Sequence, residues 1–190
     1  MKTITKITIA IVAILLILFI WYTATYNGLI KSDENVNEKW ANVQTAYQRR
    51  ADLIPNLATT VQKYANYESD ILIKVTQARA SIGSAKTPQE IDNAGSSLDN
   101  AISRLLVVAE NYPELKASEN FLSLQDELAG TENRIKTERD IYNTAIKEYN
   151  IKVRTIPSSL IASQMGLVEK VSFSASPTAQ NVPQIAEIMQ

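Results

Sequence analysis

The first thirty residues contain a long apolar run. No charged residue occurs between Lys6 and Lys31, and residues 9–20 are all Ala, Ile, Val, Leu or Phe. Roughly 20 helical residues cross the hydrocarbon core of a bilayer, so the run predicts a transmembrane helix over residues 7–27. The run ends in three aromatic residues of the kind favoured at a membrane interface: Trp21, Tyr22 and Tyr26.

The charges that flank this run predict its orientation. Two lysines precede it within residues 1–6, whereas residues 31–39 contain two lysines and three acidic residues. The positive-inside rule then keeps residues 1–6 in the cytoplasm and places the bulk of the chain on the extracytoplasmic side. An uncleaved signal anchor is favoured over a cleaved signal peptide, because bulky Trp21 and Tyr22 occupy positions where cleavage requires small residues.

A seven-residue apolar repeat follows the run. It predicts one long amphipathic helix over about residues 28–82, because eleven of its thirteen seam positions are apolar. Pro55 lies inside this helix and is expected to kink it, with a full chain reversal at Pro55 as the alternative. The seam positions are Trp40, Val43, Tyr47, Arg50, Ile54, Leu57, Val61, Tyr64, Glu68, Ile71, Val75, Ala78 and Ile82.

A second helix is expected after Gly83. Thr87 precedes Pro88, and Glu90 lies three residues after Thr87, which is typical of a capped helix start. An apolar stripe then continues until Pro113. The stripe consists of Ile91, Ala94, Leu98, Ala101, Leu105, Val108 and Tyr112.

A third helix of about 35 residues is expected from near Ser118 to Pro157. Its companion seam positions are Thr131, Glu138 and Lys152, so this seam is half polar. Its apolar seam residues are Phe121, Leu124, Leu128, Ile135, Tyr142, Ala145, Tyr149 and Ile156.

Linkers of about five residues between long amphipathic helices are typical of antiparallel neighbours. The chain is therefore expected to be all-α. An N-terminal transmembrane helix would be followed, over residues 28–157, by an elongated up-and-down antiparallel bundle of three to four long helices.

The second helix retraces only about half of the first, so either the third helix overhangs or the first bends back. Residues 158–190 are expected to form a short helical piece and a poorly ordered polar tail from Ser172.

Composition narrows the possible chemistry. The 190 residues include no His and no Cys, which excludes Ser-His-Asp and Cys-His catalysis and thiolate or imidazole metal sites. Carboxylate-bridged metal bundles also need His, and no glycine-rich loop surrounds a serine or could bind phosphate. Nineteen basic and twenty acidic residues give a formal charge of −1, which argues against nucleic-acid binding. We therefore expect no catalytic residue, metal or cofactor.

Three charged residues occupy seam positions that are otherwise apolar. They are Arg50 and Glu68 in the first helix and Glu138 in the third. One interpretation is a polar core site that binds a ligand or relays a signal. The favoured interpretation is internal ion pairing that fixes the helix register, with Arg50 or Arg134 bound to Glu132, Glu138 or Glu68.

Several motifs occur together between residues 26 and 155: Tyr26-Asn27 after the apolar run, Trp40, RRADLIPNL (49–57), ENYPELKASENFLSLQDEL (110–128), TENRI (131–135), Tyr142-Asn143 and Tyr149-Asn150. In this order they resemble the LemA family of bacterial membrane-anchored proteins. The resemblance implies a short cytoplasmic N-terminus or its mirror orientation, one anchor helix in a bacterial cell membrane, and an up-and-down α-helical bundle of three or four helices. It also implies no established enzymatic activity, and an association of some members with membrane shaping or organelle formation.

The motifs also select candidate structural or interaction residues: Arg49, Arg50, Asp52, Pro55, Tyr112, Pro113, Leu115, Glu132, Asn133 and Arg134. The leading hypothesis is a non-enzymatic scaffold at the cell envelope, anchored in the lipid bilayer and self-assembling as a homo-oligomer. Self-association would cover apolar stripes that one chain leaves open. The alternative is an adaptor or sensor that binds another membrane or envelope protein. An enzyme such as a Ser-Lys hydrolase is the least favoured hypothesis.

Overall fold

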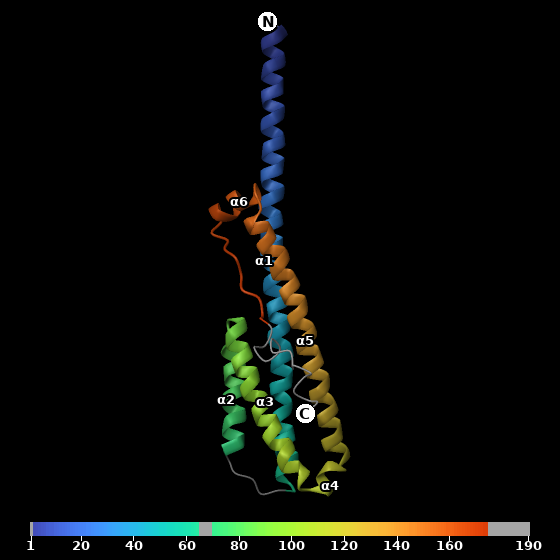
Figure 1. The fold of residues 1–190 in the computed structure, drawn as a ribbon. Coiled ribbons are helices and arrows are strands. Elements are labelled where there is room, and N and C mark those ends of the chain that lie inside the picture. Colours follow the sequence, from blue (N-terminus) through green and yellow to red (C-terminus); the bar gives the residue numbers. More distant parts are fainter. Residues whose placement is uncertain (1, 65–69, 175–190) are drawn as a thin grey trace, which may run out of the picture.

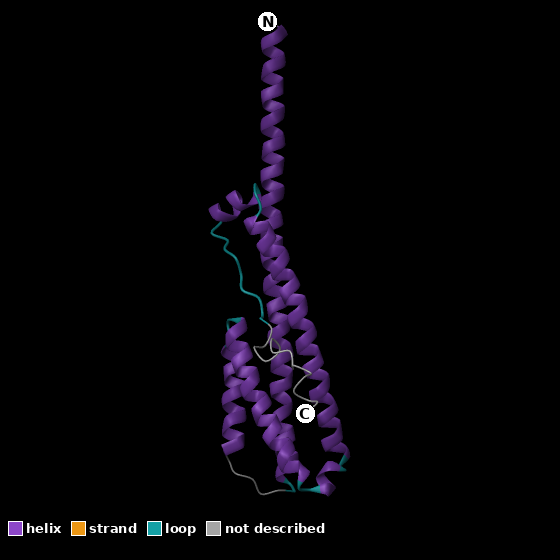
Figure 2. Cartoon of the chain, viewed as in Figure 1, coloured by secondary structure: helices purple, strands orange, loops and turns teal. Residues whose placement is uncertain are grey.

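A computed structural model describes residues 2–64 and 70–174 of the chain (Figures 1 and 2). This part is helical and contains no strand, which confirms the expected all-α fold. Its helices, in chain order, are α1 (Lys2–Gln62), α2 (Asp70–Ser84), α3 (Pro88–Glu110), α4 (Pro113–Lys116), α5 (Glu119–Arg154) and α6 (Ser158–Gln164).

The longest helix, α1, has 61 residues and is roughly 90 Å long at about 1.5 Å per residue. Its N-terminal part, residues 7–27, is called the stem here and extends beyond the bundle (Figure 1). This part of α1 is apolar, with a mean hydropathy of 2.6 over an 18-residue window. The stem is long and apolar enough to cross a membrane. Further along, Leu29, Val36 and Val43 are at most 2% exposed, so the same helix becomes part of the bundle core.

The chain reverses direction between α1 and α2, and not at Pro55. The expectation of one helix over residues 28–82 is therefore wrong. The alternative of a reversal at Pro55 is also wrong, because α1 continues for seven residues beyond Pro55. The apolar repeat does not reveal this turn because it keeps its phase: Val61 before the turn and Val75 and Ile82 after it are all at most 2% exposed. Glu68, one of the expected polar seam residues, lies outside the described residues.

The α2–α3 hairpin forms as the capping signals predict. Thr87 accepts a hydrogen bond from the Glu90 N–H at 3.2 Å, and Glu90 Oε2 accepts one from the Lys86 N–H at 2.7 Å. These bonds satisfy N–H groups that lack a partner within the helix. The helix α3 ends at Glu110, before Pro113. The α2–α3 hairpin packs beside the part of the bundle far from the stem (Figure 1).

The helix α5 returns along α1 and, as one of the two expected arrangements, overhangs the shorter hairpin toward the stem (Figure 1). Its apolar seam is buried as predicted from Phe121 to Tyr149, except that Leu124 is only partly buried. The prediction fails at the end of the helix, where Lys152 and Ile156 are exposed and Val153 is buried instead. The reason is that α5 ends at Arg154, so Ile156 no longer follows the helical repeat.

After α5 the chain turns through α6 and comes back along the bundle. Gly166 has a φ of 69°, which glycine adopts without strain, and the Leu167 N–H bonds to the Ala162 carbonyl at 3.0 Å to close the helix end. Residues 167–174, called the strap here, are extended against α1 and α5 (Figure 1). The expected poorly ordered tail is therefore wrong for residues 172–174, because Phe173 is 6% exposed; residues 175–190 lie outside the described part.

Candidate interaction site

Arg50 joins three helices in the middle of the bundle. Its side chain is only 10% exposed, and its Nη2 lies 2.7 Å from Asp99 Oδ1 on α3, while Nη1 lies 3.7 Å from Glu132 Oε2 on α5. The expected ion pair between Arg50 and Glu132 is thus present. A buried guanidinium needs such partners to offset its lost hydration, and it holds the three helices in one register.

The Asp99 carboxyl responds to this environment. Burial raises the pKa of Asp99, the Arg50 charge opposes this, and the Glu132 charge adds to it. The Nε of Arg50 is buried and has no hydrogen-bond partner within residues 2–64 and 70–174. Two of the three guanidinium nitrogens therefore carry the contacts between helices.

A second polar cluster lies beside the first. Arg139 on α5 binds Asp92 on α3 through both Nη atoms: Nη1 lies 3.0 Å from Oδ1, and Nη2 lies 3.2 Å from Oδ2. The Tyr47 hydroxyl on α1 donates to Asp92 Oδ1 at 3.2 Å. Burial raises the pKa of Tyr47 to about 12; the Arg139 charge opposes this rise and the Asp92 charge adds to it. Tyr47 is therefore a neutral hydrogen-bond donor.

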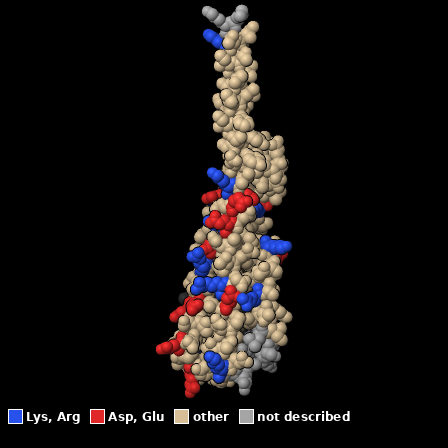
Figure 3. Space-filling model, turned by 180° about the vertical axis from the view of Figure 1, so that it is seen from behind, with Lys and Arg blue, Asp and Glu red and all other residues tan. Residues whose placement is uncertain are grey.

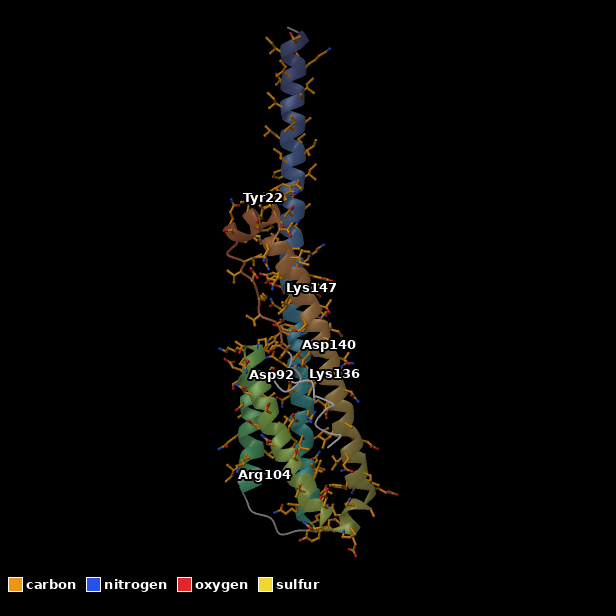
Figure 4. All side chains as sticks on the ribbon, viewed as in Figure 1. Tyr22, Asp92, Arg104, Lys136, Asp140 and Lys147 are labelled. Atoms are coloured by element: carbon orange, nitrogen blue, oxygen red, sulfur yellow. The ribbon has the colours of Figure 1, made fainter. Side chains whose placement is uncertain are left out.

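The first cluster, together with Tyr47 and Arg139 of the second, lines a cleft of about 480 Å³ between α1, α3, α5 and the end of the strap. Figure 4 labels three charged residues around this region, namely Asp92, Lys136 and Asp140. The cleft lining contains the cations Arg50, Lys136 and Arg139 and the anions Asp99, Glu132 and Asp140. The charges balance, so the cleft is polar and carries no formal net charge from these six residues.

The strap is held by two asparagines of α5. Asn143 Nδ2 donates to the Phe173 carbonyl at 3.2 Å, and Asn143 Oδ1 accepts from the Phe173 N–H at 2.8 Å. Asn150 makes the same pair with Lys170, at 2.9 Å in both directions. Each asparagine amide thus pairs with the main chain as a neighbouring strand would. These are the asparagines of the two Tyr-Asn motifs.

Aromatic and cationic side chains anchor the same strap. Phe173 packs between Trp40 and Tyr142, with ring centroids 6.1 and 5.4 Å away. The Arg139 guanidinium lies 4.4 Å from the Phe173 ring centroid. At the other end, Lys170 Nζ lies 2.7 Å from Asp33 Oδ1 on α1. The strap therefore ties α5 to α1 and is continuous with the cleft.

The first sequence motif links α1 to its neighbour α2 by an ion pair. Asp52 Oδ1 lies 2.6 Å from Arg79 Nη2 on α2. Pro55 is half-buried inside α1, and Arg49 is exposed beside Arg50. The motif thus places one arginine in the core and the next on the surface.

The second motif forms the turn at the end of the bundle far from the stem (Figure 1). Tyr112 caps the single turn α4, Pro113 begins it, and Leu115 is fully buried. Tyr112 is 37% exposed, so only its apolar neighbour Leu115 belongs to the core.

The third motif supplies charges on α5. Glu132 reaches Arg50 across the bundle, as described above. Arg134 binds Glu138 one turn further along the same helix, at 2.7 Å, and Glu138 is 3% exposed. The Glu138 charge is therefore paired within α5 rather than across the bundle. Asn133 is exposed.

The three aromatic residues at the end of the stem are exposed by 37–41%. Tyr22 and Tyr26 stack on each other, with centroids 6.3 Å apart. Figure 4 shows Tyr22 on α1 next to α6, just above the top of the bundle. This placement fits the expected interfacial position.

Several contact residues were not selected from the sequence. Asp92 and Asp99 lie on the polar side of the α3 stripe, and Arg139 lies next to the seam residue Glu138 on α5. Phe173 lies in the segment expected to be a tail. The one sequence signal for Arg139 is its position directly beside the charged seam residue Glu138.

The comparisons with known proteins agree with these motifs. The sequence model of the LemA family matches residues 39–186, which include the bundle and the strap. Protein LemA of Metamycoplasma hominis is 26% identical over 164 residues, covering 84% of this chain and 74% of that protein. Magnetosome protein MamQ 2 of Paramagnetospirillum magneticum is 25% identical over 178 residues, covering 80% of this chain.

The matched region covers only part of each relative. The chain spans 65% of the length of MamQ 2. Magnetosome protein MamQ of Magnetospirillum gryphiswaldense is 21% identical over 189 residues, covering 84% of this chain and 70% of that protein. None of these names denotes an enzyme.

Proposed function

The chain belongs to the LemA family, and on this premise we propose that it is a non-enzymatic scaffold anchored in the bacterial cell membrane. In this proposal α1 crosses the bilayer as an uncleaved signal anchor, and the bundle stands on it as a rigid rod. Copies of the rod assemble side by side at the cell envelope.

The observation that carries the proposal is the continuity of α1. One helix runs from Lys2 to Gln62, and its buried residues begin at Leu29, directly after the apolar stem. No flexible linker separates the stem from the bundle. A rod joined in this way to a membrane helix holds its outer end at a fixed distance of about 50 Å along α1 from the end of the stem, and this end moves only when the whole rod tilts. A fixed distance is a property that a scaffold uses and a soluble enzyme does not need.

Self-association has a different support from the one expected from sequence. The apolar seams of α1 and α5 are covered within one chain, so uncovered stripes do not drive it. The net charge of −1 leaves little repulsion between copies, which favours association. Lys and Arg lie interspersed with Asp and Glu on the face seen in Figure 3, so neighbouring rods can pair opposite charges.

Light scattering of the full-length protein in detergent tests this assembly. We expect a multimer that dissociates as the salt concentration rises, because exposed charge pairs are screened by salt. A salt-independent monomer with the anchor intact would refute self-assembly.

The orientation is tested separately by labelling. Since the chain has no Cys, a Ser97→Cys variant carries a single thiol on the exposed surface of α3. In intact cells, an impermeant maleimide labels this thiol if the bundle is extracytoplasmic. Labelling only after the cells are lysed would reverse the proposed orientation.

The adaptor function is kept as a second candidate because of the balanced polar cleft. Its 480 Å³ volume and mixed charges fit a polar loop of another envelope protein. A photo-crosslinking residue placed at Lys136, on the cleft wall, distinguishes the two functions. Recovery of one foreign protein in stoichiometric amount favours an adaptor, and crosslinks between copies favour the scaffold.

A further inference from the structure

The turn around α6 has an uncharged, apolar surface. Residues 155–168 contain no charged side chain, and the flanking Arg154 and Glu169 lie 3.5 Å apart, Nε to Oε1. Within this segment Ile156 is 79% exposed and Leu160 67%. Large apolar side chains so exposed are unfavourable in water unless another surface covers them.

The α6 turn is fixed to the bundle. Ile161 and Ala162 are 4% and 1% exposed, and α6 packs against both α1 and α5. The exposed apolar groups therefore belong to a rigid element, so their direction is set by the fold. The exposed side chains cannot turn into the core, because Ile161 and Ala162 on the inner face of α6 already fill that space.

The register of α5 against α1 gives the height of this turn. Trp40 packs on Tyr142, and ten residues along each helix Arg50 meets Glu132, so the two helices run antiparallel without slipping. The same register brings Arg154, the last residue of α5, opposite Gly28. Residues 155–165 must then lie beside the α1 segment between the aromatic residues of the stem and the first charges of the bundle.

The figures agree with this height. Figure 4 shows α6 beside α1 with Tyr22 just above it, and Figure 1 shows α6 at the end of the bundle nearest the stem. In Figure 3 the surface at this level bears no blue or red atoms, and the charged groups begin below it. The α1 segment at this height is also uncharged up to Lys31, and its Tyr26 and Ile30 are 37% and 39% exposed.

We propose that the α6 turn is a second membrane contact, in which Ile156 and Leu160 insert into the interfacial layer of the leaflet that surrounds the end of the stem. The inference rests on the proposed anchoring by α1. A bilayer is the occupant because α1 leaves it at this height, so lipid already surrounds the uncharged α1 surface that continues into α6. A short apolar element without charges suits the boundary between headgroups and acyl chains.

The contact has a structural role that the stem alone does not provide. A single helix leaves the rod free to rotate about the helix axis and to lean to any side. A second contact, displaced to one side of α1, fixes which face of the bundle leans toward the bilayer. Copies anchored in this way share one orientation relative to the membrane surface.

The absence of Cys allows a direct test on the full-length protein in phosphatidylcholine vesicles. The Leu160→Cys variant is labelled with an environment-sensitive fluorophore, and Val107→Cys is the matched control. Val107 is similarly exposed, at 60%, but lies near the end of α3 far from the stem. We expect label 160 to emit at shorter wavelength than label 107, to be quenched by brominated lipid, and to be protected from aqueous iodide.

Other outcomes overturn the inference. Equal iodide quenching at both positions would show that α6 lies in water. Protection from iodide without quenching by brominated lipid would show that protein, such as a second copy, covers the turn. Protein that fails to float with the vesicles would refute the anchoring itself. A monomer in light scattering with a lipid-quenched label 160 would refute self-assembly and leave the membrane contact standing.

Discussion

Asn143 and Asn150 are seven residues apart on α5 and bind strap residues that are three residues apart. Seven helical residues rise about 10.5 Å, and three extended residues span about 10 Å. The two spacings match, so both amides pair with the main chain of one straight strap at the same time. This relationship gives the two Tyr-Asn motifs a structural role, in which the tyrosine packs in the core and the asparagine holds the strap.

Replacing Asn143 with Ala should release the strap at Phe173. The change removes two hydrogen bonds to the main chain, each with a net contribution of about 1 kcal/mol. Hydrogen exchange of the full-length protein should show faster exchange of the Phe173 amide. Asn133→Ala, an exposed position on the same helix, is the control and should leave this amide protected. Unchanged protection in the Asn143 variant would mean that the aromatic contacts alone hold the strap.

Adjacent arginines should differ greatly in their effect on stability. Arg50→Met removes the contacts to Asp99 and Glu132 from a side chain that is 10% exposed, and should cost about 1–3 kcal/mol in free energy of unfolding. Arg49→Met changes an exposed side chain and should stay within about 0.5 kcal/mol. Urea unfolding followed by circular dichroism measures both. Equal costs would show that the position of Arg50 in the core is unimportant.

Two helix glycines should respond in opposite directions to alanine. A Cβ at Gly95 would lie 2.6 Å from Cε1 of Tyr47, whose hydroxyl is tied to Asp92, so Gly95→Ala should destabilise the bundle by about 1–3 kcal/mol. At Gly130 nothing lies within 4 Å of a Cβ, and Gly130→Ala should stabilise α5 by up to about 1 kcal/mol. Thermal unfolding measures both signs. Stabilisation by Gly95→Ala would contradict the close packing of α3 on α1.

Tyr47 should make the bundle less stable at high pH. Its pKa is raised to about 12 in the folded state, against 10 in the unfolded chain, so the unfolded state loses its proton first. The stabilising contribution is complete below pH 10 and is lost as pH rises toward 12, with a total on the order of 2–3 kcal/mol. Urea unfolding at several pH values should show a weaker decline for Tyr47→Phe. Parallel declines would assign the loss to other groups.

The periodicity of the sequence predicted which residues form the core better than it predicted the topology of the helices. Val61 and Val75 are fourteen residues apart and both buried, so an apolar repeat in one phase describes equally a straight helix and a helix that turns back. The alternative of a chain reversal at Pro55 was wrong, because this proline lies inside the helix α1. Thr87 and Glu90 predicted the start of α3 correctly because a capping signal is local.

The candidate site was predictable only where a residue broke the seam. Arg50 stood out as a charge among apolar positions, and its pairing with Glu132 was one of the several pairings expected. Asp92 and Asp99 occupy ordinary polar positions of α3, and their contacts depend on how the hairpin is placed against α5, which carries Arg139, and α1, which carries Arg50. Phe173 lies in a polar segment, where nothing local indicates that an aromatic pocket on α1 and α5 receives it.

With the stem in a bilayer as proposed, the absence of a break in α1 makes the outer end of the bundle sensitive to bilayer thickness. A membrane helix adapts to a thinner hydrocarbon layer by tilting, and tilts of about 20° are common. A rigid extension of about 50 Å from Gly28 to Gln62 would then move its outer end sideways by about 17 Å. In a membrane of varying thickness, such proteins would splay apart where the bilayer is thin and stand upright where it is thick.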